Sequence, residues 1–219
     1  MNYVNNYHAF RFYTKFVIKG VIGAIDCTHI AIAAPPIHDP VRPARLYMNR
    51  KGYYSINVEA ICDSNLKYMS VNARFPGSTH DSAIWSISAA AARISLIREY
   101  SIRRLNWLLG DGGYPLEPWL LTPYPTPHTS QEEKFNKMHK KARNVVERAF
   151  GVLKSRFRCL HHHRTLHYTP QRAAIIIYAC FILHNTMIDK GFIIDDLEII
   201  EYDEPENAED HDLDNFELS

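Results

Sequence analysis

The first third of the chain is a succession of short apolar stretches separated by turn residues. Residues 17–32 form an apolar run punctuated by glycine, and Pro35 and Pro36 end it. Residues 53–63 and 68–75 are rich in β-branched and aromatic side chains, and the segment that starts at Asp63 is typical of a hairpin turn. This pattern predicts three consecutive strands in an antiparallel meander.

Helical patterns dominate the remainder. Residues 81–98 have helical composition, with Ser78 or Thr79 as the N-cap, and residues 105–109 predict a short buried strand. Residues 115–130 contain five prolines and are expected to form an irregular loop. Two helices are predicted after it, over residues 131–158 and 170–189. The second is apolar nearly all round, which predicts a buried helix.

This order of elements predicts an α/β fold, a ribonuclease-H-like mixed sheet flanked by helices. In such a fold the first and fourth strands lie side by side. We expect one domain over residues 17–190, preceded by a short N-terminal segment, residues 1–16. Residues 191–219 form an acidic tail whose high charge and low apolar content predict disorder.

The charge distribution is uneven although the net charge is only +1. Half of the 24 acidic residues lie in 191–219, which has no Lys or Arg, so residues 1–190 carry 25 basic and 12 acidic side chains. A basic body beside an acidic segment favours a polyanion partner, although improved solubility is the simpler explanation of the tail. No apolar run reaches the ~18 residues of a membrane span, and the N-terminus lacks a secretory pattern, which favours an intracellular protein.

Four acidic residues stand in distinctive contexts: Asp26, Asp81, Asp111 and Glu147. Asp26 ends an apolar run, and Asp111 ends another between two glycines that permit a sharp turn. A buried carboxylate is costly unless it is paired or binds a metal, so converging acids favour a site for hard divalent cations. Asp81 lies at a predicted helix N-terminus, where capping explains it as well as metal ligation does.

Glu147 lies beside the predicted core stripe of its helix, in the sector of four basic side chains, Lys140, Arg143, Lys154 and Arg158. On the helix alone, a solvated face with ion pairs such as Glu147–Arg143 is the simpler interpretation. Together with the aspartates, Glu147 could instead help to hold two Mg²⁺ or Mn²⁺ ions for displacement at phosphorus, while the basic residues bind the DNA backbone. Cys159 and the run His161 to His163 match no common zinc template, and a polar loop is expected there.

Several ordered segments carry a family resemblance: Ile25-Asp26-Cys27-Thr28-His29, Phe75-Pro76-Gly77-Ser78-Thr79-His80-Asp81, Leu109-Gly110-Asp111-Gly112-Gly113-Tyr114 and Val146-Glu147-Arg148-Ala149-Phe150. The chain resembles Harbinger-type transposase-derived nucleases over roughly residues 20–191. The resemblance implies a DDE nuclease domain with a ribonuclease-H-like fold and metal-dependent DNA cleavage by Asp26, Asp111 and Glu147, with Asp81 as a further metal ligand. It also implies nuclear or nucleocytoplasmic location and, for some members, a Myb-like DNA-binding partner.

One departure from the family pattern keeps alternatives open. Members usually carry an N-terminal helical region before the nuclease core, and here only about 20 residues precede the first strand. A truncated copy, a mis-called gene model and a catalytic unit that relies on a partner for targeting are all compatible with this. The competing hypotheses are a domesticated protein that binds DNA or a partner without cutting, and a metallohydrolase of smaller phosphoesters, which the basic helix face disfavours.

Overall fold

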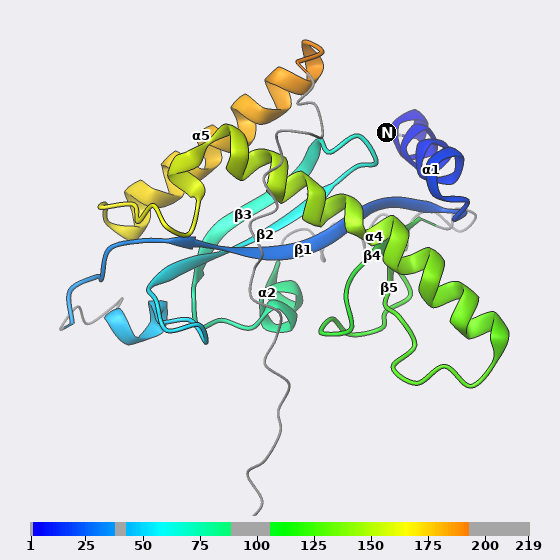
Figure 1. Ribbon diagram of the computed structural model, residues 1–219, viewed down its shortest axis with the longest axis horizontal. Coiled ribbons are helices and arrows are strands. Elements are labelled where there is room, and N and C mark those ends of the chain that lie inside the picture. Colours follow the sequence, from blue (N-terminus) through cyan, green and yellow to red (C-terminus); the bar gives the residue numbers. More distant parts are fainter. Residues whose placement is uncertain (1, 38–42, 89–105, 193–219) are drawn as a thin grey trace, which may run out of the picture.

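A five-stranded mixed sheet is the centre of the computed structural model, which describes residues 2–37, 43–88 and 106–192 (Figure 1). The strand order is β3-β2-β1-β4-β5. The strands are β1 (Val21–Ala31), β2 (Ser55–Cys62), β3 (Tyr68–Pro76), β4 (Trp107–Leu109) and β5 (Leu120–Leu121). The helices are α1 (Asn2–Phe16), α2 (Asp81–Ile87), α4 (Ser130–Arg156) and α5 (Pro170–Asp189), with 3₁₀ turns at η1 (Ala44–Tyr47) and η2 (Arg158–Leu160).

Strand β1 is the middle strand and determines what its neighbours bring to the sheet. It pairs antiparallel with β2 and parallel with β4, and β2 pairs antiparallel with β3. The predicted meander and the predicted contact between the first and fourth strands are therefore confirmed. The mixed sheet with flanking helices also confirms the predicted α/β, ribonuclease-H-like class.

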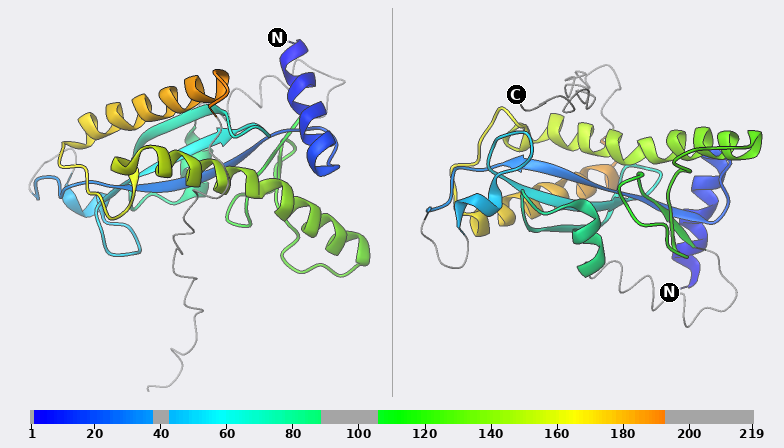
Figure 2. Two further views of the ribbon diagram at one scale, coloured as in Figure 1. Left: turned by 45° about the horizontal axis from the view of Figure 1, so that its top comes forward. Right: turned by 90° about the horizontal axis from the view of Figure 1, so that it is seen from below.

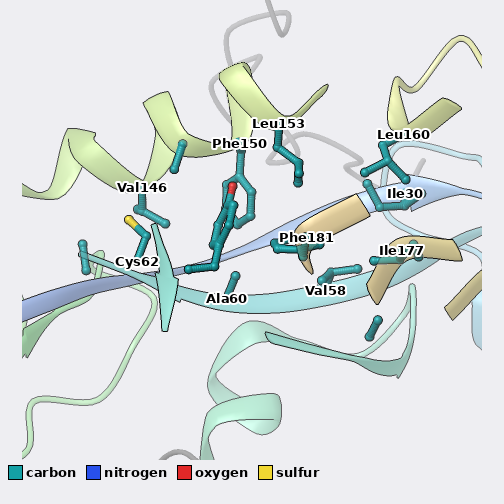
Figure 3. Packing of buried hydrophobic residues seen from close by; sticks show 14 of the residues in the cluster. Ile30, Val58, Ala60, Cys62, Val146, Phe150, Leu153, Leu160, Ile177 and Phe181 are labelled. Carbon is teal, nitrogen blue, oxygen red and sulfur yellow. The ribbon is translucent and has the colours of Figure 1, made fainter. Parts of the chain in front are cut away.

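The two faces of the sheet are covered by different helices. Helices α4 and α5 cross one face, and α2 lies against the other (Figures 1 and 2). The larger core lies under α4 and α5, where Val146, Phe150 and Phe181 meet Val58 and Ala60 of β2 (Figure 3). A smaller cluster under α2 is built around Trp85. Because side chains alternate along a strand, neighbouring residues of β1 face different helices.

Helix α4 begins where its sequence provides a complete cap. The Thr129 side chain accepts a hydrogen bond from the Glu132 backbone N–H, and the Glu132 side chain accepts one from the Thr129 backbone N–H. This capping box satisfies donors that a helix start otherwise leaves unpaired. The helix ends at Arg156, close to the predicted boundary of residue 158.

The short segment expected before the domain contains helix α1, whose Phe12 is buried in the larger core. Three local predictions were wrong. The proline-rich segment 115–130 contains the two-residue strand β5, which pairs parallel with β4. The N-cap of α2 is His80, without a side-chain hydrogen bond, rather than Ser78 or Thr79. Helix α2 ends at Ile87 with Ser88 as its extended C-cap, so the expected continuation fails there. Residues 89–98 and the acidic tail, apart from Gly191 and Phe192, lie outside the described residues.

Helix α5 is less buried than its composition predicts. One stripe packs on the sheet through Ile177 and Phe181, but Ile175 and Ile182 are 68% and 65% exposed. Among the described residues, α5 is the one helix long and apolar enough to cross a membrane by length and composition, a test that core helices of soluble proteins also pass. Composition overstated the burial because it does not reveal which faces of a helix have partners.

Candidate functional site

Parallel pairing of β1 with β4 brings two of the predicted acids to the same place on the sheet. Ala24 of β1 is in register with Leu109 of β4. Asp26 and Asp111 each follow their paired residue by two positions, so both lie beyond the same end of the β1–β4 ladder. The turn after β4 is held locally, since the Gly113 backbone N–H donates to Asp111 Oδ1 at 2.9 Å.

Helix α4 contributes the third acid, and Arg143 connects it to the sheet. Arg143 Nη1 donates to Asp26 Oδ2 at 3.1 Å, and its Nη2 donates to Glu147 Oε1. Arg143 and Glu147 lie one helical turn apart and share a face of α4. Asp26 shares the α4 side of the sheet because it is directly opposite Ala60, a core residue of that side. The structure therefore joins Asp26 and Glu147 through one guanidinium.

Burial strongly perturbs the carboxyl group of Asp26. Its side chain is 16% exposed, against 48% for Glu147. The pKa of Asp26 is raised to about 7, mainly by burial; Arg143 and the Cys27 backbone N–H oppose the rise, and the charges of Asp111 and Asp81 add to it. A pKa this high means that the surroundings of the carboxyl group do not stabilise its ionised form. A divalent cation bound beside it would provide that stabilisation.

Asp81 occupies the other side of the sheet. It begins α2, and its Oδ1 accepts a hydrogen bond from Asn57 Nδ2 at 2.8 Å. Asn57 is in register with His29 and alternates with Val58, which belongs to the α4 core. The carboxylate of Asp81 thus acts on Asp26 across the sheet through its charge, while its direct partner belongs to the α2 side.

The four residues predicted to bind DNA differ in their surroundings. Lys140 and Arg158 are exposed, and Lys154 is half-buried. The charges of Lys154 and Arg158 both reach His161, in the loop that follows α4. Arg143 is 18% exposed and is bonded to two acids, so its place in the structure is within the carboxylate cluster.

Sequence reasoning missed one buried acid, Glu59 of β2. Its residue is 2% exposed, its Oε1 has no hydrogen-bond partner, and burial raises its pKa to about 7. Glu59 is in register with Cys27 and so lies on the α2 side of the sheet. The signal was available in the alternating segment Ser55–Cys62, where a charged residue interrupts an otherwise apolar and small set.

Two groups of residues could hold a metal ion. The carboxylates of Asp26, Asp111 and Glu147 provide the oxygen ligands that Mg²⁺ and Mn²⁺ prefer, and the raised pKa of Asp26 fits a position designed for added positive charge. Within the described residues, the group of three side chains whose ligand atoms are close enough to share one metal ion is a histidine cluster and not these carboxylates. The ring nitrogens of His161, His162 and His163 lie within 4.8 Å of one another. Imidazole clusters suit transition metals such as Zn²⁺ better than Mg²⁺.

The fold and the acids define a class of protein, and comparison with known families identifies it. The DDE superfamily endonuclease family matches residues 25–185, so the chain belongs to that family. Endonucleases of this superfamily generally use divalent metals. The matched range includes all four acids singled out in the sequence, and the predicted family resemblance is confirmed.

Curated relatives refine the assignment. The chain is 36% identical over 209 residues to the mouse protein named "Putative nuclease HARBI1", covering 94% of this chain and 57% of that protein. It is 37% identical over 181 residues to the human protein of the same name, covering 82% and 49%. "Protein ALP1-like" of Arabidopsis thaliana is 30% identical over 179 residues, covering 76% and 43%. The chain spans about half the length of these relatives. No solved structure matches it.

Proposed function

We propose that this chain is a metal-dependent endonuclease of transposase origin that cleaves DNA phosphodiester bonds. The observation that carries the proposal is the convergence of Asp26 from β1, Asp111 from the end of β4 and Glu147 from α4 within the matched family range. These are hard oxygen donors from three separate elements, one of them with a pKa raised to about 7 by burial.

Each residue has a distinct part in the proposed site. Asp26 is a largely buried ligand, Asp111 is positioned by its glycine turn, and Glu147 comes from α4 and is more exposed than Asp26. Divalent ions held there would activate a hydroxyl nucleophile and neutralise charge at phosphorus. Arg143 pairs with the carboxylates of Asp26 and Glu147 when no metal ion is bound. Once these carboxylates hold a metal ion, Arg143 would be available to neutralise the charge of the substrate.

The test uses supercoiled plasmid with Mg²⁺ or Mn²⁺, and nicking is followed on gels. We expect Asp26→Asn, Asp111→Asn and Glu147→Gln each to lower the rate at least 100-fold, since each removes a ligand charge. Asp189→Asn is the matched control, because Asp189 forms an exposed ion pair with Lys67 far along the chain from these acids. Equal nicking by the three site variants and the wild type would refute the assigned roles.

A second function is favoured by the Arg143 bridge itself. Arg143 already pairs with both Asp26 and Glu147, so the acids are partly compensated without a metal. This compensation is sufficient for a domesticated protein that binds DNA or a Myb-like partner without cutting, because such a protein needs no metal ion at the acids. Calorimetric titration with Mn²⁺ separates the two functions: heat of binding that Asp26→Asn abolishes supports the nuclease, and DNA binding without such heat supports the silent binder. For either function we propose DNA as the partner and the nucleus as the main compartment.

A further inference from the structure

A groove lined by basic residues runs along the flank of α4 that faces away from the acids. Its volume is about 620 Å³, and a smaller pocket of about 120 Å³ continues it. The two share residues of the β2–β3 turn, of α4 and of the end of α5. We name it the basic groove. Its charged residues are Lys15, Lys141, Arg148 and Arg156, and its apolar floor includes Leu66 and Ile188.

The groove and the carboxylate cluster occupy opposite flanks of one helix. The buried stripe of α4 contains Ala142, Val146 and Ala149. At ~100° per residue, Glu147 lies on one side of that stripe and Arg148 on the other. Lys141 precedes Arg148 by two turns and belongs to the same flank as the groove. A ligand of the groove is therefore separate from any substrate held at Asp26 and Glu147.

Lys15 is a partly buried cation in positively charged surroundings. Burial lowers the pKa of Lys15, and the charges of Arg11 and Arg148 lower it further, while Asp63 opposes this. Lys15 Nζ donates to two neutral acceptors, Ser64 O at 2.5 Å and Asn65 Oδ1 at 2.9 Å. Crowded, partly desolvated cations of this kind favour an anionic ligand.

Arg156 provides an independent sign of a missing ligand. Its Nε and Nη1 are buried and have no hydrogen-bond partner, a costly arrangement for guanidinium donors. Its Nη2 donates to the backbone carbonyl of Phe192, which lines the same end of the groove. The chain therefore passes the groove at Phe192, immediately before the acidic segment begins.

The composition of that segment matches the groove in two respects. Residues 193–200 read Ile-Ile-Asp-Asp-Leu-Glu-Ile-Ile, so apolar side chains flank three acids. The groove offers an apolar floor and a cationic rim, whereas a nucleic-acid backbone would bring phosphates but no apolar groups to the floor. The distance along α4 from Arg156 to Lys141 is about 22 Å at ~1.5 Å per residue. Seven or eight extended residues span that length at ~3.3 Å each.

We propose that the basic groove binds the acidic-apolar segment 193–200 of the same chain, entering from Phe192 and running toward Lys141 and Lys15. The carboxylates meet the lysines and arginines of the rim, and the isoleucines and leucine cover Leu66 and Ile188. This inference is independent of nuclease activity. It gives the acidic segment a binding site on the body of the protein.

Zero-length carbodiimide cross-linking of the full-length chain, followed by peptide mass spectrometry, tests the proposal. We expect cross-links from Lys141 and Lys15 to Asp195, Asp196 or Glu198. Lys140 is the matched control, because it is adjacent in sequence, is exposed, and lies on the other flank of α4. Lys141 should exceed Lys140 at least 10-fold in cross-linked yield at a protein concentration low enough to exclude contacts between chains. Equal yields at the two lysines, or none at Lys141, would overturn the proposal.

A second measurement distinguishes the segment from nucleic acid as the occupant. If the groove binds the segment, Lys141→Glu should leave the affinity for a DNA duplex unchanged or higher, and should abolish the cross-links. A loss of DNA affinity of 10-fold or more in Lys141→Glu would make nucleic acid the ligand of the groove and overturn the assignment. Asp195→Asn with Asp196→Asn and Glu198→Gln should remove the cross-links without altering the described core.

Discussion

Replacing Asp26 by asparagine removes a buried charge from the centre of the sheet while keeping its shape. The folded-state pKa is about 7 and the ordinary value is 3.8. A carboxyl group whose pKa is raised by folding stabilises the protein fully below pH ~4, and that contribution is lost as the pH rises through 7. At ~1.36 kcal/mol per pH unit, the difference amounts to about 4 kcal/mol above pH 7. Asp26→Asn should therefore raise the free energy of unfolding by up to about 4 kcal/mol at pH 8 and change it little at pH 3.

The assay is urea unfolding followed by tryptophan fluorescence, in EDTA, at pH 3, 5.5 and 8. Glu59 also has a pKa raised to about 7, but it is present in both proteins and cancels in the comparison. Mn²⁺ should stabilise the wild type at pH 8 and leave Asp26→Asn unaffected, because a ligand stabilises only the state that binds it. A variant less stable than the wild type at pH 8, or a difference independent of pH, would show that Asp26 is not a destabilising buried charge.

Three further outcomes follow from local contacts. Arg143→Met should raise the pKa of Asp26 further, because Arg143 opposes the rise, so the loss of stability should shift to higher pH in the same unfolding assay. Thr129→Ala removes the capping box of α4 and should lower the free energy of unfolding by about 1 kcal/mol, whereas an unchanged value would mean that the helix start contributes nothing. Gly77→Ala should lower the melting temperature by several degrees in calorimetry, since the added Cβ would lie 2.8 Å from the Ser55 carbonyl oxygen.

The sequence predicted the parts of the fold that periodicity controls. Strands β1 to β3 have alternating or apolar patterns with clear turns, and the ends of α4 and α5 have strong start and stop signals. The order of elements was sufficient to predict that β1 and β4 are neighbours. Residues 2–16 were missed as a helix because polar and aromatic residues dominate them. Strand β5 was missed because two residues between prolines carry no period.

For the site, the sequence identified the acids but not their partners. Asp26, Asp111 and Glu147 were found from local context, and their roles remain predictions. The sequence predicted that Arg143 binds DNA, because helical spacing alone does not distinguish a basic residue that contacts DNA from one that pairs with an acid inside the protein. Its pairing with Asp26 depends on a contact 117 residues apart, which no local pattern contains. Glu59 was missed for the opposite reason, because its strand was considered only for its apolar residues.

From Ala24 onward β1 alternates regularly beside β2, and this has a consequence for how the chain tolerates insertions and deletions. Asp26 points to the α4 side and Cys27 to the α2 side, where its Sγ contacts the Tyr114 hydroxyl at 3.4 Å. Losing or gaining a single amino acid between Ala24 and Asp26 would exchange these two directions at once. Length changes in this stretch should therefore be tolerated far less readily than point changes, whereas the register shift between Val21 and Gly23 marks a part of β1 that is already irregular.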